Sequence, residues 1–307
     1  MKKVVIPKGV TATFIHSLPE SATPALAANF LVNNGHKVAI IIEESIPKAE
    51  EWGEDIAAFM ESLYPQGKIE FFLFDGPPDN NHPDAFEKVC DRLTVLSALL
   101  RPKSSENSQI LIATTPEALV SRCPQQKNQK ECEITLKAGM EYEFKKLCST
   151  LATAFDYSSE ILCEEPGQFS VRGGLIDVYP VNATKPVRID FFGNEIEEIR
   201  TFDPTSQRGE NKINELIISS AKSNEQNELE GEFFEYLTQP VTWIFREPEQ
   251  LVSRFPLVFH ASINKSFRLA SFGNAMNRKH AALDQFIGSS EIQAGEGIFE
   301  KCESLEL

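Results

Sequence analysis

The feature that most constrains the fold is the alternation of short apolar runs with longer helix-like segments over the first 120 residues. The run Val38–Ile42 is apolar without interruption, which is typical of a strand buried on both faces of a sheet. The segment before it begins at Pro24, repeats apolar residues at helical spacing and ends at Gly35. Because strands that alternate with helices build parallel sheets, we expect an α/β layer.

The other elements of this layer follow the same alternation. Strands are predicted at Ala12–His16, Val38–Ile42, 69–74 and 110–113, and helices over 24–34, 50–63 and 84–100, with a short one after Pro116. The polar stretch 124–133 then marks a boundary.

Beyond this boundary the pattern changes to a helix around 142–152 and short alternating runs separated by Gly, Pro and Asn. These runs, at 169–172, 175–179, Val187–Phe192, Glu195–Phe202 and 213–218, predict a small, mainly antiparallel sheet. After a polar linker at 221–231, strands are predicted at 241–245 and 257–260. We therefore expect three parts: an α/β domain at 1–123, a β-rich domain at 134–220 and an α/β return segment at 232–307.

The charge balance argues against several functions. The 45 acidic residues outnumber the 30 basic ones, giving a formal net charge of −15. Since nucleic acids are bound through basic surfaces, such a chain is a poor autonomous binder of DNA or RNA. An acidic mimic of DNA is a further possibility, which rests on net charge alone. Without an apolar run near the roughly 18 residues of a membrane span, or a secretory signal, we expect a cytoplasmic protein with no membrane contact.

No cofactor or metal site is expected either. The six cysteines are scattered, without a Cys-x-x-Cys pair, and are interpreted as reduced thiols. The turn at 17–24 is where a P-loop would cradle phosphates, but Ser17 and Ala22 replace its glycines, Thr23 replaces its Lys and Glu20 would repel a triphosphate. We therefore expect an NTPase-like architecture that has lost NTP hydrolysis, and so no enzyme.

Strand alternation points to one exposed surface. In Val187–Phe192 the residues Arg188, Asp190 and Phe192 lie on the face opposite the apolar ones, and Arg172 lies on the outer face of the run 169–172. Arginine beside an aromatic ring is enriched at protein interfaces, so this face is a candidate docking surface. The alternative, held equal, is that the two arginines merely pair with Asp177 or Asp190 across strands.

One long stretch carries a resemblance to a known family. It reads Gly-Gln-Phe-Ser-Val-Arg-Gly-Gly-Leu-Ile-Asp-Val-Tyr-Pro at 167–180, Arg-Ile-Asp-Phe-Phe at 188–192 and Phe-Asp-Pro at 202–204. This order resembles domain 2 of the excinuclease protein UvrB and of the bacterial transcription-repair coupling factor. More weakly, the flanking α/β parts resemble the first and third pieces of the same module (domains 1a and 1b).

Two departures favour the coupling factor. UvrB has an intact P-loop and a Tyr-rich β-hairpin that clamps DNA, whereas here the turn at 17–24 is degenerate and only a short polar loop follows Phe74. In the coupling-factor family the N-terminal module keeps the surface that recruits the excinuclease protein UvrA. The resemblance assigns that recruitment to Arg172, Arg188 and Phe192.

The resemblance implies a non-catalytic adaptor of nucleotide excision repair and transcription-coupled repair. Its fold would be a degenerate P-loop NTPase-like parallel sheet with an inserted small β-rich (α+β) domain. RNA polymerase and DNA would be contacted only through domains absent from this chain, which is either an N-terminal fragment or a short stand-alone paralogue. The alternative is an NTP-dependent DNA helicase or damage-recognition protein of the UvrB type, which a nucleotide titration would distinguish.

Overall fold

The chain forms two compact units, which are described separately. The computed structural model describes residues 12–16, 19–78, 84–101, 108–126, 132–221, 231–246, 266–273 and 289–293. The first unit comprises Met1–Gly76, Leu99–Ser121 and Phe233–Leu307, and the second comprises Pro77–Ala98 and Arg122–Glu232.

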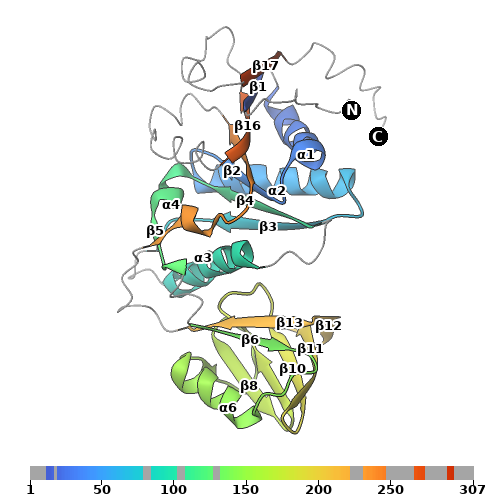
Figure 1. Ribbon diagram of the computed structural model, residues 1–307, viewed down its shortest axis with the longest axis vertical. Coiled ribbons are helices and arrows are strands. Elements are labelled where there is room, and N and C mark those ends of the chain that lie inside the picture. Colours follow the sequence, from blue (N-terminus) through green and yellow to red (C-terminus); the bar gives the residue numbers. More distant parts are fainter. Residues whose placement is uncertain are drawn as a thin grey trace. The chain divides into compact units, whose positions relative to one another are not determined.

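A seven-stranded sheet, parallel at every pairing, forms the first unit (Figure 1). Its order is β17-β1-β16-β15-β2-β4-β3. The strands are β1 Ala12–His16, β2 Val38–Ile42, β3 Lys68–Phe74, β4 Ser108–Thr114, β15 Val241–Arg246, β16 Ser266–Gly273 and β17 Ser289–Gln293. The predicted parallel α/β layer is confirmed. β16 and β17 were not predicted, and the strand expected at 257–260 lies outside the described residues.

Helices cover this sheet with apolar side chains. They are α1 Thr23–Asn34, α2 Ile46–Leu63 and the short α4 Pro116–Val120, with the 3-10 turns η1 Glu20–Ala22 and η3 Phe233–Tyr236. Leu26, Phe30, Trp52 and Ile56 of the first two helices pack with Ile41 of β2 in one core cluster. The helix expected at 50–63 begins earlier, because Ser45 precedes a first turn that contains a proline.

The second unit is built mainly from antiparallel strands. Its six-stranded sheet has the order β12-β11-β10-β9-β8-β7, antiparallel except between β7 and β8. The strands are β7 Ser158–Ser159, β8 Gln168–Arg172, β9 Leu175–Val178, β10 Val187–Phe192, β11 Glu195–Phe202 and β12 Gly209–Lys212. Two-stranded pairs are formed by β6 Glu133–Lys137 with β13 Glu215–Ser219 and by β5 Arg122–Cys123 with β14 Gly231–Glu232.

One face of the six-stranded sheet forms the core of this unit. Val187, Ile189 and Phe191 of β10 are buried, as the alternation predicted, and they pack with Leu147 and Leu151. These leucines belong to α6 Phe144–Ser149 and the following π-helical turn η2 Thr150–Ala154, where one helix was expected. The helix α3 Ala85–Leu100 adds Cys90 to the same cluster.

Two tight hairpins fix the register of this sheet. Gly173 and Gly174 join β8 to β9, and Gly193 with Asn194 joins β10 to β11; Gly173 and Gly193 have φ values of 61° and 65°. Such left-handed conformations favour glycine in two-residue hairpin loops. At Gly174 a Cβ atom would lie 2.8 Å from the carbonyl oxygen of Phe191, so a side chain has no room there.

Within the described segments, no helix has both the length and the apolar character needed to cross a lipid bilayer.

Candidate protein-docking face

The strand register places the three predicted residues on one face of the six-stranded sheet. Arg172 lies opposite Leu175, which lies opposite Asp190, and one row further along Ser170, Asp177 and Arg188 are aligned in the same way. Phe192 follows Asp190 by two residues on β10 and therefore points to the same side. We call this side of the sheet, with Ser170, Arg172, Asp177, Arg188, Asp190 and Phe192, the docking face; Ser170 and Asp177 are buried at its base.

The two hairpins bring Arg172 and Phe192 to the same end of this face. Strands β8 and β10 are both antiparallel to β9, so they run in the same direction and end at the same edge. With one strand between them, their backbones are about 10 Å apart. The cation and the ring can thus contact one partner together.

Phe192 is the exposed aromatic group of the docking face. Its exposed fraction is 73%, whereas Phe191 beside it is 6% exposed and packs edge-on against Phe144. Covering a benzyl group that is exposed to water removes apolar surface from water, so a partner that covers Phe192 binds with a more favourable free energy.

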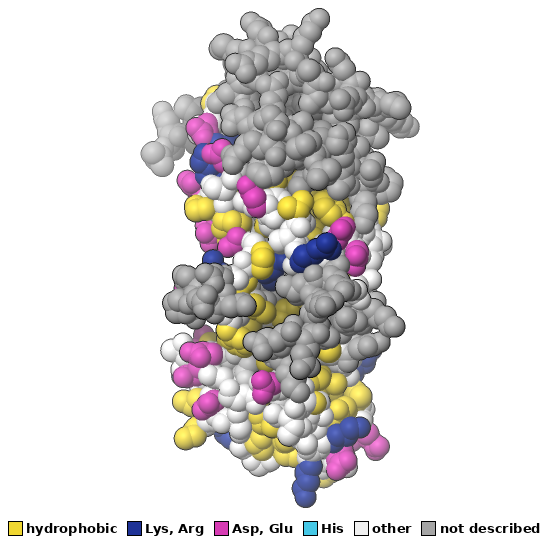
Figure 2. All heavy atoms as spheres, turned by 90° about the vertical axis from the view of Figure 1, so that its left-hand side faces the viewer, with side chains coloured by type: hydrophobic (Ala, Val, Ile, Leu, Met, Phe, Trp, Pro, Cys, Tyr) yellow, Lys and Arg dark blue, Asp and Glu magenta, His cyan; other side chains and the backbone are white. Residues whose placement is uncertain are grey.

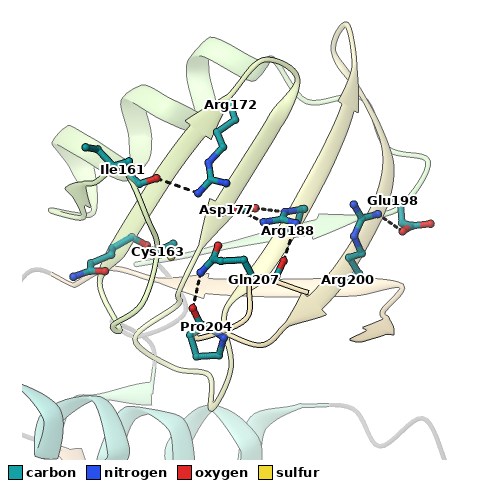
Figure 3. A network of polar contacts seen from close by, with 10 residues as sticks. Ile161, Cys163, Arg172, Asp177, Arg188, Glu198, Arg200, Pro204 and Gln207 are labelled. Atoms are coloured by element: carbon teal, nitrogen blue, oxygen red, sulfur yellow. Dashed lines mark hydrogen bonds and ion pairs between the residues drawn. The ribbon is translucent and has the colours of Figure 1, made fainter. Parts of the chain in front are cut away.

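Arg172 is exposed at the end of β8. Its Nη2 group donates a hydrogen bond of 3.1 Å to the carbonyl oxygen of Ile161 (Figure 3). Among the described residues no other partner takes its remaining N–H groups, so they can bind acceptors on a second protein.

Arg188 is different, because Asp177 already binds it. Its Nε and Nη2 atoms donate to the two carboxylate oxygens of Asp177 at 2.6 and 2.7 Å (Figure 3). The two side chains are only 13% and 2% exposed, and the hydrogen bonds to Asp177 raise the pKa of Arg188. The cross-strand pairing considered from the sequence is therefore present for Arg188, whereas Arg172 has no such carboxylate partner among the described residues.

The guanidinium group of Arg188 also contacts Phe202 and Gln207. The group lies 4.9 Å from the ring centroid of Phe202, and its Nη1 atom donates to the carbonyl oxygen of Gln207 at 3.4 Å. Arg188 thus organises the base of the docking face and presents little of its charge to solvent. Alternation alone could not reveal this, because it does not give the register between β9 and β10 that sets Asp177 opposite Arg188.

Ion pairs lie along the neighbouring strand β11. The carboxylate of Glu198 accepts from Arg200 at 2.5 Å and also pairs with Lys212 of β12. Hydrogen bonds from Lys212 and Arg200 lower the pKa of Glu198. On the face shown in Figure 2, the described Lys and Arg side chains are separated by hydrophobic and acidic ones and form no continuous basic stripe.

In the first unit, an ion pair holds Glu20, in the described part of the turn at 17–24. Arg246 at the end of β15 donates to Glu43 at 2.9 Å and also pairs with Glu20 of the turn. Its guanidinium carbon lies 5.6 Å from the ring centroid of Trp52, whose Nε1 donates to Thr23. Two carboxylates thus pair with the guanidinium group of Arg246 at this edge of the parallel sheet. In open α/β sheets this is the edge at which ligands bind.

Comparisons with known proteins agree with the resemblance. A family described as "UvrB interaction domain" matches residues 134–223. The transcription-repair-coupling factor of Bacillus subtilis is 28% identical over 62% of this chain and 16% of its own length. Those of Staphylococcus epidermidis and Myxococcus xanthus are 38% and 40% identical over 30% and 27% of this chain, which are 8% and 7% of their lengths.

The chain thus spans about a sixth or less of the relatives it matches. Its matched domain coincides with the part of the second unit that carries the docking face. The chain is a partial homologue of the transcription-repair-coupling factors, corresponding to their N-terminal region and carrying a UvrB interaction domain.

Proposed function

We propose that this chain is a non-catalytic adaptor of nucleotide excision repair and transcription-coupled repair, and that its docking face recruits UvrA. The observation that carries the proposal is the presence of Phe192, 73% exposed, on a domain that matches the family described as "UvrB interaction domain". An exposed aromatic ring beside an exposed guanidinium group is a combination enriched at protein interfaces.

The three residues have different roles in this proposal. Phe192 buries its ring in the partner, and Arg172 offers N–H donors to acidic or carbonyl acceptors. Arg188 is a positioning residue that, through Asp177, holds the strands of the face in register.

The non-catalytic part of the proposal is supported by the first unit. Its sheet is parallel, the turn at 17–24 offers no Lys, and Arg246 pairs with Glu20 and Glu43. We infer that the parts at 1–123 and 232–307 are the scaffold and that 134–220 is the recruiting domain. Contacts to RNA polymerase and DNA would belong to domains absent from this chain.

Isothermal titration of purified UvrA into this chain tests the proposal. We expect saturable binding, and Phe192→Ala is expected to weaken it by about 2 kcal/mol, or roughly thirtyfold in the dissociation constant. Arg172→Ala is expected to weaken it as well. The matched control is Phe59→Ala in α2, because Phe59 is also a partly exposed ring, 43% exposed, in the first unit.

Two results would contradict the proposal. Unchanged affinity in both Phe192→Ala and Arg172→Ala would remove the docking face from the interface. Saturable ATP binding by the chain, with no binding of UvrA, would favour a nucleotide-dependent helicase or damage-recognition protein instead.

A further inference from the structure

The loop between β7 and β8 carries an exposed hydrophobic tip. Ile161 is 88% exposed and Leu162 is 42% exposed, the former being the most exposed large hydrophobic residue in the described part of the chain. Three exposed carboxylates, Glu160, Glu164 and Glu165, surround this tip in the sequence. We call residues 160–165 the tip loop.

The tip loop is held by hydrogen bonds at its base. The amide of Glu160 donates to the carbonyl oxygen of Phe169 at 2.8 Å. The side-chain oxygen of Gln168 accepts from the amides of Glu164 and Glu165, both at 3.0 Å. The buried thiol of Cys163 donates to the carbonyl oxygen of Gln168 at 3.3 Å. Since these bonds fix the loop beforehand, little conformational entropy is lost when a partner covers the tip.

Arg172 connects the tip loop to the docking face. Its Nη2 donates to the carbonyl oxygen of Ile161, and Figure 3 shows the arginine reaching from its strand toward that residue. In the strand order, Arg172 on β8 stands between the loop that follows the edge strand β7 and Phe192 on β10. The exposed surface thus continues from the ring of Phe192, through the guanidinium group of Arg172, to Ile161 and Leu162 of the tip loop.

We propose that Ile161 and Leu162 form a second anchor for UvrA, and that the three glutamates of the tip loop contact Lys or Arg side chains around the receiving pocket. The inference rests on the proposed function and names a further part of the same interface. Charge complementarity supports this occupant, because a protein that acts on DNA carries basic surface, and an acidic rim suits such a surface. An apolar centre within a charged rim is the usual arrangement of an energetically important contact.

Titrations of UvrA with two matched variants test this anchor. Ile161→Ser is expected to raise the dissociation constant by at least about tenfold. Because the side chain is 88% exposed, the fold should tolerate the change. The control is Val120→Ser in α4, another β-branched residue with 56% exposure that lies in the first unit, and it should leave the affinity unchanged.

A second variant tests the acidic rim. Replacing Glu160, Glu164 and Glu165 together by Gln is expected to slow association and to reduce the dependence of the association rate on salt. The rate is measured by surface plasmon resonance at low and at high salt, on either side of about 0.15 M. Unchanged association rates would overturn the role of the rim.

The outcomes separate this inference from the proposed function. If Phe192→Ala weakens binding but Ile161→Ser does not, the second anchor is overturned and the adaptor proposal stands. If the unaltered chain does not bind UvrA, the adaptor proposal itself fails. A loss in Ile161→Ser equal to that in Val120→Ser would also overturn the anchor, because it would reflect loss of apolar surface anywhere on the chain.

Discussion

Strands β2 and β10 show how differently the two units treat the faces of their sheets. All five residues of β2 are buried, whereas β10 buries Val187, Ile189 and Phe191, leaves the two residues between them partly exposed and ends at the exposed Phe192. In a sheet that is covered on both faces, a substitution at any strand position alters the packing of the core. The one-sided sheet can keep a binding surface while its core stays fixed, so recognition is expected in the second unit.

The largest expected effect concerns the base of the docking face. Arg188→Ala leaves the carboxylate of Asp177 buried without its cation, and removing one partner of a buried pair costs about 3 kcal/mol or more. We expect this loss in the free energy of unfolding, measured by urea denaturation. Arg172→Ala, at an exposed position, should lose less than about 0.5 kcal/mol.

A double variant sharpens this result. In Asp177→Asn/Arg188→Met neither charge remains, so much of the lost stability should return. If Arg188→Ala and Arg172→Ala were equally stable, Arg188 would be a surface residue like Arg172, and its positioning role would be wrong.

A smaller effect is expected where α2 packs against the parallel sheet. A Cβ atom at Gly53 would lie 2.5 Å from Cε2 of Phe71 and 2.9 Å from Cβ of Ala113. Gly53→Ala should therefore lower the free energy of unfolding by about 2 kcal/mol, although alanine favours helices.

The matched control is Gly76→Ala in the same unit. A Cβ atom there meets nothing within 4 Å, so its stability should stay within about 0.5 kcal/mol. If Gly53→Ala had the same free energy of unfolding as Gly76→Ala, the packing between α2 and the parallel sheet would tolerate an added methyl group, and the expected difference between the two sheets would be wrong.

The smallest effect is a difference in pH dependence between two glutamates. Burial raises the pKa of Glu43 in the first unit despite Arg246, whereas Lys212 and Arg200 lower the pKa of Glu198 in the second. With a raised folded-state pKa, Glu43 contributes less stability as the pH rises through the interval between its ordinary and raised values. With a lowered one, Glu198 contributes stability above its ordinary pKa that is lost as the pH falls through the lowered value.

Carbon-13 NMR titration of the two carboxyl groups measures this difference. The midpoint of Glu43 is expected above that of a glutamate in an unstructured peptide, and the midpoint of Glu198 below it. A midpoint of Glu43 below the peptide value would show that its pairing with Arg246 outweighs burial.

Much of the fold was predictable because hydrophobic periodicity is local. The limits of β2, β10 and β11 agree with the apolar patterns, and so does the parallel order of strands and helices. Strand β16, with Arg268 and two serines among its apolar residues, offers no clear pattern of either period.

The candidate site was predictable in part for a similar reason. Alternation gives the face on which Arg172, Arg188 and Phe192 lie, but it does not give the register that pairs Arg188 with Asp177. Ile161 leaves no signal, because it and the adjacent Leu162 are only two apolar residues in a short loop and show no period. Only its solvent exposure in the folded chain distinguishes it from a core residue.

The hydrogen-bonded sulfur beneath the tip loop has a practical consequence. Burial raises the pKa of Cys163 to about 12, so the thiol stays protonated at neutral pH, and alkylating reagents, which react with thiolates, should leave it unmodified. Any conformational opening that lifts the loop would restore its reactivity. Cys163 is thus a native chemical reporter, whose labelling rate follows the closure of this segment without an introduced probe.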